Sequence, residues 1–363
     1  MTPAPSLNGL VTLASVQQST GFAHAPDGSR IAYATVGSGP PIVLPAWWVS
    51  HVVEDWRFAP LRRFIEGLAD GRTVVRYDRV GTGLSERKRR PETVNPDFEV
   101  ATLCAVLDEV AVERVALFGI SCGCCTAASF CASWPERIDR LVLYGGYADG
   151  HTLGSPRART GMVDLVRSHW GLGSRLLADV FGPNWSLEER AGFTEMQRVS
   201  ADAQVAASLL ELVYDTDVRE DLVRVGAPTL IVHRENDRAT PLECAREVAG
   251  LLPNAELVTL AGNTHLPWHG DGDAVLRAVA AFLGITAPPA KMNEPDASRL
   301  KELSAREREV LSLVAEGLSD GQIAVELVIS PHTVHRHVAN ILAKLGLPTR
   351  SAAAAHAAKA GLL

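Results

Sequence analysis

Six short apolar runs, separated by stretches with helical periodicity, constrain the fold of this chain more than any other feature of its sequence. The runs occupy residues 41–45, 73–77, 115–120, 141–144, 229–233 and 255–260. Strands that alternate with helices predict a mainly parallel sheet with helices on both faces. Upstream, Asp27-Gly28 favours a tight turn between segments 22–25 and 30–35, so we expect an antiparallel hairpin at the sheet edge.

Two interruptions of this pattern predict the domain organisation. Between about residues 150 and 223 the strand signal disappears and helical periodicity takes its place, which indicates a lid inserted into the sheet domain. Residues 286–298 contain three prolines and read as a linker. We therefore expect a large domain at 1–285 and a small domain at 299–363.

Charge and cysteine content narrow the class of protein. The net charge is -7, but residues 299–363 carry eight Lys and Arg against six Asp and Glu, so only this tail favours phosphate. The six cysteines lack zinc-ligand spacing, and the N-terminus lacks a signal-peptide pattern. Small and polar residues interrupt the uncharged segment 115–135, which argues against a membrane span. We expect a cytoplasmic protein with free thiols, no metal, no cofactor and no membrane contact.

Capping signals predict three helices in the tail. Ser304 and Glu307 have the spacing of a capping box, and Ser319 can open a second short helix. Ser330-Pro331 supplies an N-cap and a first-turn proline for a third helix. The third helix follows the second almost at once, so the tail is expected to be a small all-α domain.

The third helix is expected to have one buried face and one polar face. Its apolar residues recur at spacings of four, three and four, namely Val334, Val338, Ile341 and Leu345. With the small Ala339 and Ala343, the remaining surface carries the residues expected to contact DNA, which are His332, Thr333, His335, Arg336, His337, Asn340 and Lys344. Small residues among donors allow a helix to approach base edges closely. The alternative is a helical hairpin that only caps the other domain, but capping does not require such a polar face.

Segments 303–311 and 330–346 resemble the LuxR-type helix-turn-helix family. The resemblance implies a four-helix module that binds double-stranded DNA through its third helix. It also implies a homodimer formed through the last helix, here about residues 351–360. His335 stands where the family usually has Lys after Thr-Val, so this contact is expected to be weaker or pH-dependent.

A second motif lies at the end of the third apolar run. Gly119-Ile120-Ser121-Cys122-Gly123 predicts the strand, sharp turn and helix that expose a nucleophilic serine. Serine needs a base, and the base needs an orienting carboxylate, in the chain order serine, acid, histidine. Asp237 and His265, each beside a later strand, are the candidates, and the alternatives are Glu235 and His269.

Together with the loop at 76–85, this set resembles the α/β-hydrolase superfamily over residues 21–285. The resemblance implies an α/β-hydrolase fold and an oxyanion hole formed by the backbone N–H groups of Cys122 and Trp47. Many relatives have His-Gly before the second of these donors, whereas this chain has Pro45-Ala46. Because loss of one oxyanion donor costs roughly 10²–10³ in rate, we expect slow catalysis.

Tryptophans indicate the nature of the ligand. Those in loops or in the lid suggest a pocket for an apolar or aromatic molecule, and the candidates are Trp48, Trp170, Trp185 and Trp268, beside Trp47. The alternative for each is an ordinary core tryptophan. Cys124 and Cys125 are interpreted as small buried residues behind the serine, with redox sensing as the alternative.

The fusion of the two domains predicts a transcriptional regulator whose hydrolase-like domain binds a small molecule and so controls DNA binding. Within this hypothesis, the three residues of the triad either hydrolyse the ligand slowly, which we favour, or only bind it. One alternative is a serine esterase with a vestigial DNA-binding tail, which predicts fast turnover. Another is a DNA-binding protein whose hydrolase fold is only a platform for a partner or a dimer.

Overall fold

A computed structural model describes residues 17–285, 303–345, 350, 353, 354 and 357, and the chain divides into two compact units at 1–288 and 289–363. The predicted linker at 286–298 lies outside the described residues, as does most of the predicted last helix at 351–360. None of the described helices is long and apolar enough to cross a membrane.

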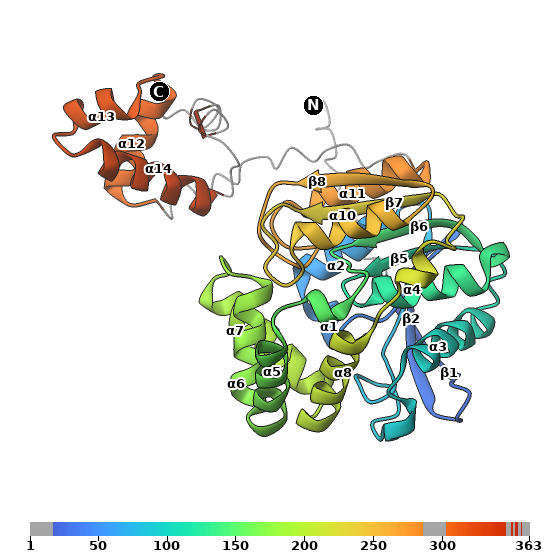
Figure 1. The fold of residues 1–363 in the computed structure, drawn as a ribbon. Coiled ribbons are helices and arrows are strands. Elements are labelled where there is room, and N and C mark those ends of the chain that lie inside the picture. Colours follow the sequence, from blue (N-terminus) through green and yellow to red (C-terminus); the bar gives the residue numbers. More distant parts are fainter. Residues whose placement is uncertain (1–16, 286–302, 346–349, 351–352, 355–356, 358–363) are drawn as a thin grey trace, which may run out of the picture. The chain divides into compact units, whose positions relative to one another are not determined.

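The larger unit is built on an eight-stranded sheet of order β1-β2-β4-β3-β5-β6-β7-β8 (Figure 1). The strands are β1 (Ser19–His24), β2 (Arg30–Gly37), β3 (Pro41–Leu44), β4 (Thr73–Tyr77), β5 (Val115–Ile120), β6 (Ile138–Tyr144), β7 (Thr229–Arg234) and β8 (Ala255–Leu260). Strands β3 to β8 pair in parallel, and β2 pairs antiparallel with β1 and β4. The predicted parallel sheet and its edge hairpin are therefore confirmed.

Strand β6 begins three residues before the predicted start at residue 141. Ile138 is buried and pairs with Val115, so the ladder extends to it. Asp139 and Arg140 follow in the sequence and interrupt the apolar run, which conceals this part of the strand from a hydropathy pattern. Pairing with a neighbouring strand overrode the local signal.

Helices cover both faces of the sheet and form two separate apolar cores. One core contains residues of α3 (Pro96–Glu109), α4 (Gly123–Ser133) and α10 (Leu242–Leu251). The other contains residues of α2 (Ala59–Leu68) and α11 (Gly272–Leu283). The central strand β5 is buried along its whole length, and its alternate side chains enter the two cores, because successive residues of a strand point to opposite faces. The short helices are α1 (Glu54–Arg57), η1 (Pro91–Thr93), η2 (Pro135–Arg137) and η3 (Gly150–Thr152).

A group of helices is inserted between β6 and β7 and lies to one side of the sheet (Figure 1). It consists of α5 (Pro156–Ser168), α6 (Trp170–Phe181), α7 (Leu187–Ser200), α8 (Ala203–Asp215) and the short α9 (Arg219–Leu222). Ser155, Ser186 and Asp202 cap the first turns of α5, α7 and α8. Helix α6 forms although Gly171 and Gly173 lower its intrinsic helix propensity. We refer to α5–α9 as the lid.

The smaller unit contains α12 (Ala305–Ala315), α13 (Asp320–Glu326) and α14 (Pro331–Leu345). Capping boxes are present at Ser304 with Glu307 and at Ser319 with Gln322, and Ser330 Oγ accepts a hydrogen bond from Thr333 N–H. The buried stripe of α14 is the expected one, and it packs with residues of α12 and α13 in a single core. Together with the family match reported below, these helices confirm the predicted small all-α domain.

Candidate functional sites

Ser121 lies in a strained turn between β5 and α4. Its φ of 56° is in the left-handed region, which a residue with a Cβ adopts only at a cost. A Cβ at Gly119 would lie 2.7 Å from Cys124 Cα, and one at Gly123 would lie 2.8 Å from the Pro45 carbonyl oxygen. Both glycines are thus required for the close approach of backbone segments around the serine. The geometry is that of a nucleophile elbow.

Ser121, His265 and Asp237 form a continuous hydrogen-bonded triad. Ser121 Oγ lies 2.8 Å from His265 Nε2, and His265 Nδ1 lies 2.7 Å from Asp237 Oδ2. Asp237 Oδ1 accepts hydrogen bonds from the N–H groups of Ala239 and Thr240. Burial by itself raises the pKa of Asp237, but the interaction with His265 outweighs it and lowers the pKa below the ordinary value. Asp237 is therefore suited to orient a histidine base that takes the serine proton.

The structure does not bring the alternative residues to Ser121. Glu235 is exposed. His269 is buried, and its ring packs 4.2 Å from that of Trp185, measured between centroids, with Nδ1 3.8 Å from Glu189. Burial lowers the pKa of His269 to about 4, so this ring is neutral near pH 7. It belongs to an aromatic cluster and does not contact the serine.

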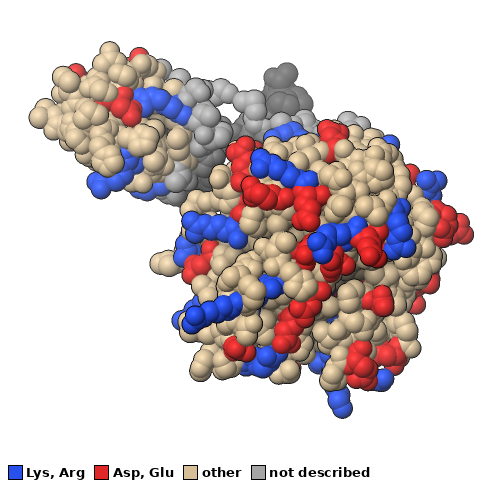
Figure 2. Space-filling view, viewed as in Figure 1, with Lys and Arg blue, Asp and Glu red and all other residues tan. Residues whose placement is uncertain are grey.

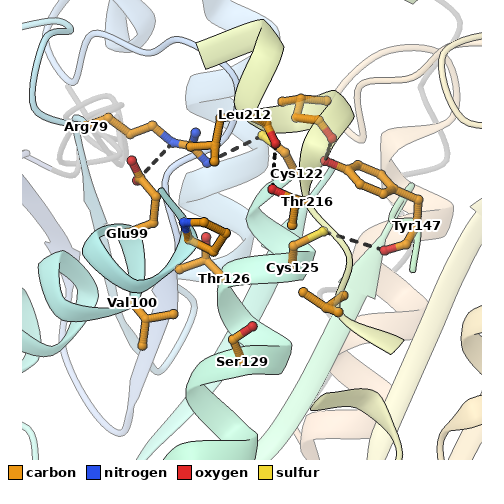
Figure 3. Close-up of a pocket in the computed structure, with 13 residues that line it drawn as sticks. Arg79, Glu99, Val100, Cys122, Cys125, Thr126, Ser129, Tyr147, Leu212 and Thr216 are labelled. Atoms are coloured by element: carbon orange, nitrogen blue, oxygen red, sulfur yellow. Dashed lines mark hydrogen bonds and ion pairs between the residues drawn. The ribbon is translucent and has the colours of Figure 1, made fainter. Parts of the chain in front are cut away.

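Arg79 connects the two predicted oxyanion donors, although sequence analysis gave it no role. Its Nε and Nη2 both donate to the Ala46 carbonyl oxygen. Nη2 also lies 3.5 Å from Cys122 Sγ, as Figure 3 shows. The Ala46 carbonyl belongs to the same peptide group as the Trp47 N–H, so these bonds fix the direction in which that N–H points. Within the described residues, the N–H groups of Trp47 and Cys122 make no hydrogen bond of their own.

A buried ion pair holds Arg79 in place. Arg79 Nε lies 3.4 Å from Glu99, whose other oxygen lies 2.7 Å from Arg89 Nη2. Burial raises the pKa of Glu99, but the two arginines outweigh it and lower the pKa, which keeps the carboxylate charged. A small cavity of about 20 Å³ lies beside Arg79, behind the elbow (Figure 3). The only sequence signal for this network is a pair of arginines in the loop after β4, and its acidic partner on α3 cannot be identified from local spacing.

A cavity of about 210 Å³ opens beside Ser121 and His265 under the lid. Its walls are mainly apolar and include Trp48 and residues of α5, α6 and α8. The lid is tied to the histidine, because His265 N–H donates to the Phe181 carbonyl oxygen at 2.8 Å and the two rings lie 5.1 Å apart. A ligand in this cavity would be enclosed between the triad and the lid.

Of the four predicted pocket tryptophans, Trp48 alone lines this cavity. Trp268 packs 5.4 Å from Trp47, and both line a neighbouring cavity of about 310 Å³. Trp170 donates from Nε1 to the Ala201 carbonyl oxygen, and Trp185 packs in the aromatic cluster of His269. The remaining three do not line the cavity beside Ser121, and their contact with a ligand stays a prediction.

Cys124 and Cys125 lie behind the elbow and are buried. Burial raises the pKa of both thiols, which opposes formation of the reactive thiolate.

Within the described part of the chain, no group of three or more His, Cys, Asp or Glu is arranged to hold a metal ion. On the visible face of the larger unit, acidic and basic side chains are intermingled (Figure 2).

Helix α14 presents several of the predicted DNA contacts to solvent. His332, His335, Arg336 and Asn340 are exposed, whereas Thr333 and His337 are half-buried. His335 Nδ1 lies 3.6 Å from Asp320 of α13.

Lys344 is also exposed, but its side chain has an ion-pair partner within the chain. Its Nζ lies 2.6 Å from the buried Glu307. Burial raises the pKa of Glu307, but the hydrogen bonds from Lys344 and Ser304 outweigh it and lower the pKa to about 2. Lys344 thus joins α14 to α12, and its contact with DNA stays a prediction.

Comparisons with known proteins agree with this division. The sequence model described as "Alpha/beta hydrolase family" matches residues 42–278, and that described as "Bacterial regulatory proteins, luxR family" matches residues 301–357. A curated relative is the 2-hydroxy-6-oxononadienedioate/2-hydroxy-6-oxononatrienedioate hydrolase of Escherichia coli O139:H28 (strain E24377A / ETEC). It is 25% identical over 264 residues, which span 70% of this chain and 91% of that protein.

Solved structures show the same fold in the larger unit. The enol-lactonase from Burkholderia xenovorans LB400 aligns with a TM-score of 0.61 at 24% identity and covers 73% of this chain and 100% of its own. An esterase from Exiguobacterium antarcticum aligns with a TM-score of 0.64 at 17% identity and covers 72% of this chain and 98% of its own.

Proposed function

Because the chain belongs to the α/β hydrolase family and carries a DNA-binding domain of the LuxR family, we propose that it is a transcriptional regulator controlled by a small ligand. The observation that carries the proposal is an enclosed cavity beside a complete triad, in the same chain as a DNA-binding helix. Ligand binding alters DNA affinity to the extent that the ligand prefers one of two arrangements of the chain.

We further propose that the triad hydrolyses its ligand slowly. Ser121 Oγ attacks a carbonyl carbon, His265 Nε2 accepts the serine proton, and Asp237 stabilises the resulting imidazolium. The N–H groups of Trp47 and Cys122 stabilise the oxyanion, and the imidazolium of His265 protonates the leaving group as its bond to the carbonyl carbon breaks. Water, deprotonated by His265, then attacks the acyl-serine, and Ser121 regains its proton as the acid is released. Relatives named as hydrolases support this activity. Slow turnover would make the response end when the ligand is consumed.

On the DNA side, we propose that α14 enters the major groove and that Arg336 contacts base or phosphate. A homodimer would place two such helices about one helical turn of DNA apart, as paired half-sites require. A DNA partner and the free thiols are consistent with a protein that works in the cytoplasm.

The test is recovery of genomic DNA fragments by the full-length protein, with and without a cell extract that supplies the ligand. Wild type is compared with Ser121→Ala, Arg336→Ala and the control Arg308→Ala, which removes an exposed arginine of α12. We expect sites that are lost with Arg336→Ala, kept with Arg308→Ala, and shifted by the extract in a manner that depends on Ser121. Recovery of no site under any condition would contradict the proposal.

A second candidate is a serine esterase whose tail no longer binds DNA. The intact triad favours it, since efficient hydrolysis needs all three residues in this arrangement. It predicts rapid, Ser121-dependent turnover of activated esters together with no salt-sensitive DNA binding. The same fragment recovery experiment, combined with an ester assay, distinguishes the two functions.

A further inference from the structure

Two arginines, Arg159 and Arg238, line the cavity that contains Ser121 and His265. We propose that this cavity takes an apolar ligand that carries a carboxylate at some distance from the carbonyl group presented to Ser121. The inference rests on the proposed hydrolytic function of Ser121, and it specifies the class of substrate. Both arginines come from segments that border the triad, one from the lid and one from the turn after β7.

Arg159 is a half-buried cation that has no carboxylate partner among the described residues. It lies on α5, and its Nη1 donates only a long hydrogen bond of 3.5 Å to the Tyr214 carbonyl oxygen. Its Nε is buried and has no partner among the described residues. A buried guanidinium N–H that is left unpaired is unfavourable, and an anionic ligand would satisfy it.

Arg238 directly follows the triad acid, Asp237. The turn that carries it is ordered, because Asp237 Oδ1 accepts hydrogen bonds from Ala239 and Thr240. Within the described residues, the Arg238 side chain has neither a hydrogen bond nor an ion pair. By contrast, two other arginines of the lid, Arg167 and Arg190, pair with Glu211 and Asp179. The lid therefore contains carboxylates that pair with arginine, and none of them reaches the two arginines of the cavity.

The other residues that line the cavity do not offset the positive charge of the two arginines. None of the described residues that line it is Asp or Glu, and apolar side chains such as Met162, Leu177 and Val180 form much of the wall. Charge interactions are stronger beside low-dielectric walls, so the half-buried Arg159, together with the solvent-exposed Arg238, attracts an anion.

Guanidinium matches both carboxylate and phosphate in geometry, so the choice between them rests on charge. A carboxylate carries a single charge and loses less hydration than a doubly charged phosphate monoester when it enters an apolar cavity. The occupant is therefore assigned as a carboxylate.

The test compares two activated esters of equal acyl length, mono-p-nitrophenyl adipate and the neutral p-nitrophenyl hexanoate. We expect wild type to hydrolyse the adipate ester with a kcat/KM about tenfold or more above that of the hexanoate ester. Arg159→Gln and Arg238→Gln should each lower kcat/KM for the adipate ester by about tenfold to a hundredfold and leave the hexanoate ester within about twofold. Arg175→Gln, an exposed arginine of α6 outside the cavity, is the matched control.

A preference of wild type for the neutral ester would overturn the proposal, as would an equal loss for both esters in the two variants. Binding is measured separately by calorimetry in Ser121→Ala, with monomethyl adipate and hexyl phosphate as probes. If wild type hydrolyses neither ester, the hydrolytic function is wrong, whereas binding of monomethyl adipate that depends on Arg159 still supports the carboxylate site. No binding of monomethyl adipate, or tighter binding of hexyl phosphate, would refute that site.

Discussion

The triad and the exposed face of α14 both consist of polar side chains, but the two regions differ in burial and in whether these side chains have hydrogen-bond partners within the chain. Asp237 and His265 are buried, and each polar atom of the pair has a partner within the chain. Arg336 and Asn340 are exposed, and no described residue binds their side chains. A reaction site gains from groups that are already ordered before the ligand arrives, whereas a DNA-reading helix must keep its donors free for a partner. The two units can therefore be damaged independently.

The largest difference between the effect on ester hydrolysis and the effect on DNA binding is expected from Ser121→Ala. Loss of the nucleophile should lower kcat for an activated ester by about 10⁴-fold or more, because the rest of the triad cannot act without it. DNA affinity measured without ligand should not change, since Ser121 lies in the larger unit. Ester hydrolysis and fluorescence anisotropy with recovered DNA measure the two effects. Ser168→Ala, on α5, is the control, and equal turnover in both variants would remove Ser121 from the mechanism.

His269 in the larger unit and Glu307 in the smaller unit should lose their contributions to stability in different pH ranges as the pH falls. His269 has a pKa of about 4 in the folded chain and about 6.5 when unfolded, so the unfolded state binds more protons between these values. Stability of the larger unit from this group is present above pH 6.5 and falls by about 3 kcal/mol as the pH is lowered to 4. Glu307, with a pKa of about 2, contributes stability above its ordinary pKa that is lost as pH falls from about 4.5 to 2.

Tryptophan fluorescence during urea unfolding measures the His269 effect, because all seven tryptophans lie in the larger unit. Burial raises the pKa of Asp55 to about 7, which gives a pH slope of opposite sign, so the quantity of interest is the difference between wild type and His269→Phe. We expect the variant to lose less stability between pH 6.5 and 4, while the exposed-site control His24→Asn behaves as wild type. Identical pH slopes in wild type and His269→Phe would refute the assignment.

Substitution of Arg79 tests whether its hydrogen bonds hold the two oxyanion donors in position. Arg79→Lys keeps the charge but cannot donate the same pair of hydrogen bonds to Ala46. We expect kcat to fall by about tenfold to a hundredfold and KM to stay within about twofold, because a positioning residue acts mainly on the transition state. Arg89→Lys, which alters the same Glu99 pair without touching Ala46 or Cys122, is the control. A rise in KM alone would exclude the positioning role.

The smallest effect is expected from helix caps. Ser304→Ala removes a capping box and should destabilise α12 by about 1 kcal/mol, seen as faster hydrogen exchange at residues 305–315. Ser186→Ala removes the equivalent box of α7 and should change exchange only in the larger unit. If either variant altered exchange in both units, the two units would not be energetically independent.

The sheet, and the three residues that form the hydrogen-bonded triad, could be predicted from the sequence because both follow from local patterns and from the order of segments along the chain. Apolar runs mark the strands, and Asp237 and His265 lie in loops after two of them. Contacts between side chains that are far apart in the sequence could not be predicted, because only tertiary packing brings them together. One such contact is the ion pair between Lys344 and Glu307, which are 37 residues apart in the sequence. Arg79 was unassigned for the same reason, because its partners Ala46 and Glu99 come from separate segments.

The hydrogen bond from the backbone N–H of His265 to the Phe181 carbonyl joins the end of α6 to the loop that carries the histidine. Phe181 also lines the cavity beside Ser121. A displacement of the end of α6 would therefore change the wall of the cavity and the position of the histidine together.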